Sequence, residues 1–287
     1  PDLSATEETY RALVMGLRSY VNHAGFNGVV LGLSGGIDSA LSLAIAVDAL
    51  GADKVHAVMM PYTYTSAISL EDAQAQATRL KVKFHILPIH AIVDSFTETL
   101  APFLVEQTTD STEENLQARA RGVLLMALSN KLNLMVLTTG NKSEMAVGYA
   151  TLYGDMVGGF NALKDVYKTQ VFELAGYRNS LSKKPVIPER VISRAPSAEL
   201  RPDQTDQDSL PPYELLDAIL YGYIERDLSA GQLIAEGFDA AVVKKVLHMV
   251  DRHEYKRRQA VIGSKISVRA FGRERRYPMV NGWTVDE

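Results

Sequence analysis

The 287-residue chain contains no cysteine. This absence excludes disulfide bonds, iron–sulfur clusters, cysteine-ligated zinc and any cysteine nucleophile within the chain. No apolar run approaches the roughly 18 residues of a membrane helix, and the sequence does not start with the basic-then-apolar pattern of a secretory signal. We therefore expect a cytoplasmic protein that does not associate with a membrane.

An excess of positive charge is missing as well. Asp and Glu number 34 against 30 Lys and Arg, so the formal net charge is −4. Proteins that bind polynucleotides usually present a basic field. The segment 252–276 is locally basic, but in an acidic chain such a segment more often serves a small anionic substrate or a subunit contact. We expect no nucleic-acid partner.

Short apolar runs alternate with helical patterns over the first part of the chain. The runs are rich in β-branched and aliphatic residues, as in strands that are covered on both faces, and they span 28–34, 54–61, 83–89 and 134–140. Helical periodicity covers 5–23, 39–50, 69–81, 90–104, 112–132 and 168–181. The alternation predicts an α/β fold, a Rossmann-like doubly wound parallel sheet over about 25–182.

The pattern changes in the last third. A polar, proline-containing stretch at 183–212 precedes helical patterns at 213–225, 229–236 and 239–259. We expect a helical C-terminal part over about 211–287, within a single domain that spans 1–287. A connection as long as 194–212 is usually functional or mobile.

The sequence Gly-Leu-Ser-Gly-Gly-Ile-Asp-Ser at 32–39 joins the first predicted strand to a helix. Backbone N–H groups without helical partners point outward at such a helix start, where the helix dipole is also positive, so an anion binds there. Gly35 and Gly36 allow a close approach of the ligand, and Ser34 and Ser39 add hydroxyl donors. A nucleotide phosphate is the natural ligand, although a tight turn that needs glycine for packing alone remains the alternative.

Acidic residues near this loop indicate a cation. Asp38 would repel a phosphate unless a hard metal such as Mg²⁺ lay between them. Glu144 follows the strand at 134–140, and Asp155 lies in a glycine-rich turn, so both are expected to converge with Asp38 at one sheet edge. Each acid alone is more often a solvated surface residue or a helix N-terminal acid.

The predicted helix at 112–132 is amphipathic. Its apolar stripe is expected to place four residues in the core: Leu116, Val123, Leu124 and Leu128. Asn115, Arg119 and Arg121 are left on a polar face, where the arginines either bind a phosphate bidentately or are solvated.

Taken together, these motifs resemble the N-type ATP pyrophosphatases, and among them NAD synthetase. SGGIDS resembles the pyrophosphate loop of the superfamily, whose members transfer AMP. In agreement, the loop lacks the lysine that the P-loop motif G-x-x-x-x-G-K-[ST] requires. The further motifs that resemble NAD synthetase are ENLQARAR, TTGNKSE, YGDMVGGF, LKDVYKTQVFELA, RAPSAEL, DQTDQDSLPPYE, EYKRRQ and RAFGRERRYP. The last of them resembles the glutamine-dependent branch in particular.

The resemblance implies roles for individual residues. ATP would be bound by Gly32, Leu33, Ser34, Gly35, Gly36, Ile37, Asp38, Ser39, Thr139, Lys168 and Ser197. Deamido-NAD would be bound by Asn115, Arg119, Glu144 and Lys256. Magnesium would be held by Asp38, Glu144 and Asp155, and the catalytic residues would be Asp38, Glu144 and Lys168.

The activity that the resemblance implies is ATP-dependent amidation of deamido-NAD to NAD with ammonia, through an adenylate, with release of AMP and pyrophosphate. The alternative is another adenylating amidotransferase with the same loop, such as a GMP-synthetase-like enzyme. Two positions depart from the ammonia-dependent branch, because Leu152 and Gly159 stand where that branch has a lysine and an aspartate.

The resemblance also implies partners. A glutaminase domain of the glutamine-dependent branch uses a cysteine nucleophile, which this chain lacks. We therefore expect either direct use of ammonia or a glutaminase domain or subunit beside this chain, and the start at Pro1 favours a portion of a longer protein. By analogy with the family, a homodimer is expected.

Overall fold

A parallel five-stranded sheet forms the centre of the computed structural model, which describes residues 3–104, 111–202, 204–280 and 282. Within these residues the strand order is β3-β2-β1-β4-β5. The strands are β1 (Val29–Gly32), β2 (Val55–Met59), β3 (Lys83–Ile86), β4 (Met135–Thr138) and β5 (Phe160–Asn161). Helices cover both faces, which confirms the predicted doubly wound α/β class.

Both faces of the sheet are apolar because neighbouring side chains of a strand point in opposite directions. In β1, Val29 and Leu31 belong to one buried cluster, while Val30 belongs to another on the opposite face. The same alternation places Met135 and Val136 of β4 in different clusters. Because both faces of these two strands are buried, their sequences are continuous apolar runs rather than an alternation of apolar and polar residues.

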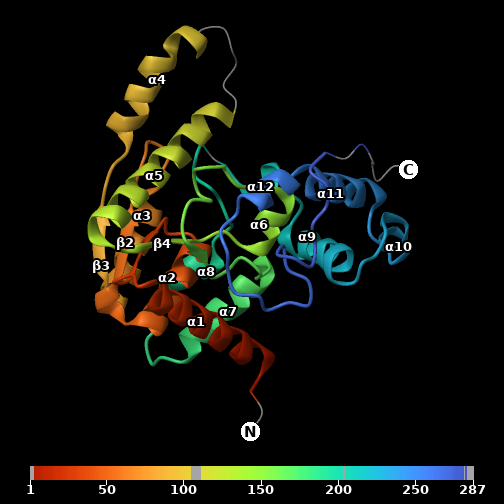
Figure 1. Ribbon diagram of the computed structural model, residues 1–287, viewed down its shortest axis with the longest axis horizontal. Helices are drawn as coiled ribbons and strands as arrows, with labels where there is room; N and C mark the ends of the chain where they lie inside the picture. Colours follow the sequence, from red (N-terminus) through yellow and green to blue (C-terminus); the bar gives the residue numbers. More distant parts are fainter. Residues whose placement is uncertain (1–2, 105–110, 203, 281, 283–287) are drawn as a thin grey trace.

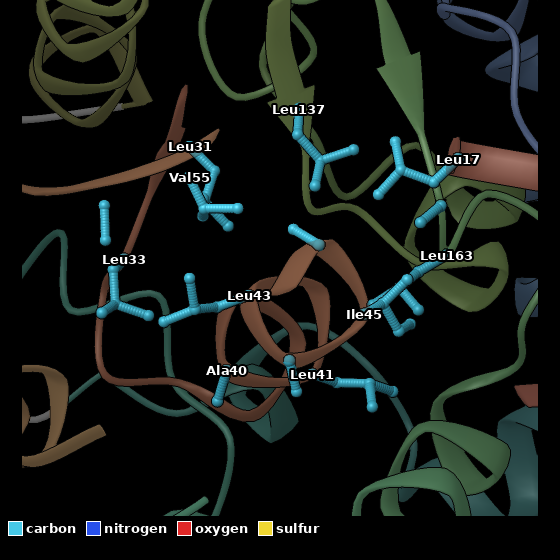
Figure 2. Close-up of a cluster of buried hydrophobic side chains, with 14 of the residues drawn as sticks. Leu17, Leu31, Leu33, Ala40, Leu41, Leu43, Ile45, Val55, Leu137 and Leu163 are labelled. Atoms are coloured by element: carbon cyan, nitrogen blue, oxygen red, sulfur yellow. The ribbon is translucent and has the colours of Figure 1, made fainter. Parts of the chain in front are cut away.

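The first face is covered mainly by α1 (Ala5–Ala24), α2 (Ile37–Leu50), α3 (Ala67–Leu80) and α7 (Lys168–Ser180). Figure 2 shows side chains of β1 and β2, including Leu31 and Val55, pointing toward Leu43 of α2. Helix α2 is buried nearly all round, as its mainly apolar sequence requires. A short 3₁₀ helix, η1 (Ala52–Lys54), joins α2 to β2.

The second face is covered by α4 (His90–Leu104) and α5 (Ser111–Leu132), which lie above the sheet in Figure 1. The expectation for α5 was wrong in part, because Val123 is 64% exposed. Small residues of α5 face the turn at 153–157 instead: a Cβ on Gly122 would lie 3.0 Å from the Gly154 carbonyl oxygen, and a Cβ on Gly154 would lie 2.9 Å from the Ala118 Cβ. Only small side chains fit against the turn that contains Gly154. The helix therefore buries the face with Ala118 and Gly122, and Val123 of the predicted apolar stripe is exposed.

A second group of helices lies to the right in Figure 1 and has its own apolar cluster, in which residues of α9, η3, α10 and α11 take part. These helices are α6 (Lys142–Val147), α9 (Tyr213–Leu220), α10 (Ala230–Ala235), α11 (Ala240–Arg252) and α12 (Glu254–Arg258). The short helix α8 (Glu189–Ser193) packs instead against α2 and α7, and its Val191 belongs to the cluster of the first sheet face. A 3₁₀ helix η2 (Asp206–Asp208) precedes α9, and a π-helix η3 (Tyr221–Glu225) follows it.

Two elements differ from expectation. The fifth strand was not predicted: it follows the glycine-rich segment and has only two residues, too few to show a period of two in the sequence. The predicted helix at 239–259 breaks at His253, which has non-helical dihedrals and whose imidazole packs on Gly148, where a Cβ would lie 2.2 Å from the ring. Among the described residues no helix is long and apolar enough to cross a membrane.

Candidate active site

The loop after β1 runs directly into α2 and leaves the start of that helix open to a cavity of about 180 Å³. Gly35 has φ of +82°, and a Cβ there would lie 2.4 Å from the Ser69 carbonyl oxygen, so only glycine fits. A Cβ on Gly36 would meet just one nearby atom, Ser34 Oγ at 3.3 Å, and the position therefore keeps the helix start uncovered. The first N–H groups of α2 have no acceptor within the helix and are available to an anion.

The hydroxyl groups of the loop shape it from within. Ser39 Oγ donates to the Gly36 carbonyl (2.9 Å) and accepts from the Ser34 N–H (3.2 Å). Ser34 Oγ accepts from the Gly36 N–H (3.2 Å). These bonds hold the turn in the conformation that presents its backbone to the cavity. The predicted residues Ser34 to Ser39 all line this cavity.

Lys168, the first residue of α7, is the centre of the charged part of the site. Its Nζ donates to Asp38 Oδ2 (2.5 Å) and to Glu144 Oε1 (3.3 Å). The lysine side chain is 2% exposed, whereas each carboxylate keeps 17% exposure toward the cavity. The structure therefore brings together the three residues that were predicted to be catalytic.

Asn141 holds both acids in place and was not predicted as a site residue. Its side-chain amide donates to Asp38 Oδ1 (2.8 Å), and its Oδ1 caps α6 by accepting the Glu144 N–H (3.0 Å). Glu144 Oε2 in turn accepts the Asn141 N–H (3.3 Å), which completes a capping box. The pattern Asn-x-x-Glu was the sequence signal that could have revealed this role.

The protonation of the site follows from its burial. Burial raises the pKa of Glu144 to about 8, although Lys168 opposes the shift. Burial alone would lower the pKa of Lys168, but the charges of Asp38 and Glu144 outweigh it and raise the pKa. Lys168 is thus a permanent cation, and Glu144 is the carboxyl whose charge depends on what else occupies the cavity.

Asp206 is a further acid of the same cavity; it stands in the motif DQTDQDSLPPYE, but no role was predicted for it. It is 3% exposed, and its carboxylate accepts from Tyr213 Oη (2.8 Å) and Tyr149 Oη (3.4 Å). Burial raises its pKa, while the Tyr213 hydrogen bond and Lys168 lower it. The residue lies in η2, inside the long connection that was expected to be functional or mobile.

Three other predicted residues line the same cavity in different ways. Thr139 follows β4 at the cavity wall. Ser197 Oγ donates to the Gln204 carbonyl (2.5 Å) and so closes a turn beside the cavity. Asp155 Oδ1 accepts the Thr151 N–H (2.7 Å), and burial raises the pKa of this carboxyl to about 6.

A second cavity of about 260 Å³ adjoins the first and is more apolar. It opens at the carboxyl ends of β1, β2 and β4, and Gly32, Leu33 and Thr139 contribute to its wall. Arg121 also lines it and donates from Nε to the Met60 carbonyl (3.0 Å). Burial lowers the pKa of Arg121 to about 10, which places a buried cation beside an apolar slot.

The predicted dinucleotide-binding residues of α5 and α12 gather around residues 148–152. Lys256 Nζ donates to the carbonyl groups of residues 148 and 150 (2.7 Å each). Arg119 Nε donates to the Leu152 carbonyl (3.2 Å), and Asn115 Oδ1 accepts from Thr151 Oγ1 (2.8 Å). The segment that they hold contributes two residues, 149 and 150, to the first cavity.

The oxygen atoms available for a metal come from few side chains. In the part of the chain that the structure describes, no three acidic, histidine or cysteine residues form a group that could hold a metal ion by itself. The prediction of magnesium therefore depends on Asp38 and Glu144 together with oxygen atoms from a phosphate and water, which is how Mg²⁺ is commonly bound beside nucleotides.

A glycine loop at the carboxyl edge of a parallel sheet, with a lysine and two carboxylates at the helix start, defines a nucleotide-binding domain of the adenine nucleotide alpha hydrolase-like class. The family model described as NAD synthase matches residues 9–260, and the chain belongs to that family.

Named relatives agree with this assignment. The chain is 69% identical to a glutamine-dependent NAD(+) synthetase of Acinetobacter baylyi, over all of this chain and 53% of that protein. It is 64% identical to a glutamine-dependent NAD+ synthetase of Acinetobacter baumannii solved with ADP, with a TM-score of 0.68, over 100% of this chain and 52% of that one. An NH3-dependent NAD synthetase of Campylobacter jejuni is 27% identical, with a TM-score of 0.71. The match covers 89% of this chain and 96% of that one. The chain thus spans about half the length of the curated relatives it matches.

Proposed function

We propose that this chain catalyses the ATP-dependent amidation of deamido-NAD to NAD, with release of AMP and pyrophosphate. The observation that carries the proposal is the position of Lys168 Nζ, between Asp38 and Glu144 at the uncovered start of α2. A site that only binds adenine nucleotide needs no such acid pair. Membership of the NAD synthase family supports the choice of substrate over that of a GMP-synthetase-like enzyme.

The two adjoining cavities suggest how ATP lies. The triphosphate would rest against the backbone at 34–39, and the adenosine would enter the apolar slot beside Arg121. The long segment that includes Ser197 borders both cavities, since Ala198 lines each of them. Deamido-NAD would then enter the first cavity from the side of Asn115 and Lys256, which contact the segment 148–151 at its wall.

The donor set fits magnesium. Asp38 and Glu144 present oxygen atoms that keep some exposure beside the phosphate-binding backbone, and hard cations prefer oxygen ligands. Bound there, with Asp155 as the further candidate ligand, the ion would neutralise the charge of the departing pyrophosphate. Lys168, relieved of its two carboxylates, would then be free to contact a phosphate oxygen.

The proposed reaction has two steps, and the protein positions the reactants in both. The nicotinate carboxylate forms a bond to the α-phosphorus of ATP as the bond to pyrophosphate breaks, and an adenylate results. Ammonia then attacks the activated carbonyl carbon, AMP leaves, and one proton is released. Lys168 and the loop N–H groups stabilise the negative charge that builds on the leaving pyrophosphate.

The nitrogen source and the assembly belong to the same proposal. We propose that ammonia comes from a glutaminase domain or subunit, since the chain has no cysteine and its relatives are named glutamine-dependent. We also propose a homodimer in the cytoplasm. The exposed apolar residues Val123, Met126 and Tyr153, which line a surface hollow on α5, support a subunit contact there.

The test is an assay of the purified chain with ATP, MgCl₂ and deamido-NAD, with ammonium chloride compared against glutamine. We expect NAD and AMP to form in equal amounts with ammonium, and not with glutamine alone. Xanthosine monophosphate in place of deamido-NAD should give no AMP. AMP release with that substrate, and none with deamido-NAD, would overturn the proposal.

The substitution Glu144→Gln tests the metal assignment separately. It keeps the shape of the side chain and the capping of α6, but it removes the charge. We expect turnover to be lost while ATP binding stays detectable by titration calorimetry. A fully active Glu144→Gln variant would show that the magnesium assignment is wrong.

A further inference from the structure

Lys142 is a second buried lysine, and the proposed reaction does not use it. Its side chain is fully buried, and its Nζ makes ion pairs with Asp165 (2.7 Å) and with Glu225. The same nitrogen donates to Ser267 Oγ (2.8 Å) and to the Arg269 carbonyl (2.9 Å). We refer to Lys142, Asp165, Glu225 and Ser267 as the buried hub.

The hub holds the C-terminal segment 266–269 in place. Asp165 Oδ2 accepts the backbone N–H groups of residues 266 and 267 (2.8 Å each), and the Ser267 hydroxyl donates to the same carboxyl group (2.8 Å). Glu225 Oε2 accepts the Arg269 N–H (2.9 Å). Each acid therefore binds the lysine and the segment at once.

Glu225 reaches the hub from the last position of the π-helix η3. A π-helix is rare, occurs mostly as a single turn within an α-helix and is frequently found at functional sites. Here it directs a carboxylate into the protein interior, where Tyr167 Oη also donates to it (3.5 Å). The π-helix thus places Glu225 in an interior contact, and Glu225 lines neither of the two cavities described above.

The hub is joined to both helix starts of the active site by very short stretches of chain. Lys142 is the first residue of α6, which carries Glu144, and Asp165 lies three residues before Lys168. The two helix starts are also bonded to each other, since the Lys168 N–H donates to Ser143 Oγ (2.9 Å). A shift of the hub would therefore reach both Glu144 and Lys168.

We propose that Lys142 is a positioning residue, and that the buried hub makes docking of segment 266–269 a condition for the correct placement of Glu144 and Lys168. This inference rests on the proposed function, because those two residues act on the nucleotide. A displacement of about 1 Å at a reacting group is enough to slow a reaction 100-fold. The C-terminal segment thus completes the active site without touching the ligand.

The test uses Glu225→Gln, which keeps the side-chain shape and leaves Lys142 paired with Asp165. We expect kcat for NAD formation to fall about 10-fold and the affinity for Mg–ATP to fall several-fold. The matched control is Asp48→Asn, which removes the carboxylate that Arg178 binds through Nε (2.6 Å) far from the site. The control should lower the denaturation midpoint and leave kcat and Mg–ATP affinity unchanged.

Charge balance provides a second test. Lys142→Gln leaves two carboxylates without their cation, whereas Lys142→Gln combined with Glu225→Gln restores a neutral pair in the place of Lys142 and Glu225. We expect the double variant to recover folding and to regain part of the kcat that Lys142→Gln loses.

Two outcomes separate the failures. If the parent chain binds Mg–ATP but forms no NAD, the proposed function fails, and Mg–ATP titration of Glu225→Gln still tests the hub. If the parent is active and Glu225→Gln matches Asp48→Asn in kcat and in Mg–ATP affinity, the hub is structural only and the inference is overturned.

Discussion

Two buried lysines, Lys168 and Lys142, have nearly the same immediate chemistry and opposite surroundings. Each side chain is at most 2% exposed and is faced by two carboxylates. Lys168 lies beside a cavity onto which its carboxylate partners open. Lys142 is enclosed by protein on all sides, and its acids bind backbone N–H groups as well.

The difference teaches what makes a charged cluster a site. Around Lys142 the carboxylate oxygens are used by the chain, so exchange with a ligand would break several bonds. Around Lys168, Asp38 and Glu144 keep exposed oxygen atoms, and the helix start beside them is uncovered. A buried ion pair is costly to form and gives little net stability, so an incompletely surrounded pair beside a cavity indicates a binding or catalytic site.

The largest expected effect is on activity, at Lys168, the lysine beside the cavity. Lys168→Met should lower the rate of NAD formation on the order of 10³-fold, because it removes the group that we propose to stabilise the leaving pyrophosphate. The free energy of unfolding should change little, since the two carboxylates it leaves can be hydrated from the cavity. Steady-state kinetics and urea denaturation measure the two effects, and a variant that loses its fold rather than its rate would contradict the comparison.

At Lys142, the lysine that protein encloses on all sides, the expected effect is on stability. Lys142→Met leaves Asp165 and Glu225 buried without a cation, and breaking a buried pair in this way costs about 3–5 kcal/mol. Urea denaturation of the purified variant against the parent measures the loss. A cost below about 1 kcal/mol would mean that water reaches the hub and that the two lysines are not opposites.

Substitution by arginine sharpens the comparison because the charge is kept and only the volume changes. Lys142→Arg has no space for the larger head group and should cost about 1–3 kcal/mol of stability. Lys168→Arg can extend into the cavity, so its denaturation midpoint should stay close to that of the parent. The two midpoints are measured side by side, and equal losses would go against the proposed difference in enclosure.

The smallest expected effect concerns pH. The folded ligand-free chain keeps the Glu144 proton up to a pKa of about 8, whereas the unfolded chain releases it near 4.5. The folded state binds more protons between these values, so the free energy of unfolding falls as pH rises from 5 to 8.

Glu144→Gln is the control for this pH dependence, because the amide cannot titrate. Urea denaturation at several pH values should give a flatter profile for the variant than for the parent. Parallel profiles would show that Glu144 is already ionised in the free protein and that its pKa is not raised.

The parts of the site that could be predicted are local in the sequence. The glycine loop lies between a strand and a helix, and Asp38, Glu144 and Lys168 stand in short motifs next to element boundaries. Parallel strands bring those boundaries to one sheet edge, so their meeting could be expected. Asn141 was missed even though its capping box is local, because its bond to Asp38 joins residues 103 positions apart.

The sequence by itself determined the class of the fold, the glycine loop at 32–39 and the charged residues near it, because hydrophobic periodicity and backbone requirements of glycine act over a few residues. The tertiary structure alone decided which face of α5 is buried, where the two-residue β5 pairs, and that Asp206 enters the cavity. It also decided that one lysine is open and the other sealed. Both lysines stand at helix starts, and only the packing of distant segments such as 266–269 determines which of them a ligand can reach.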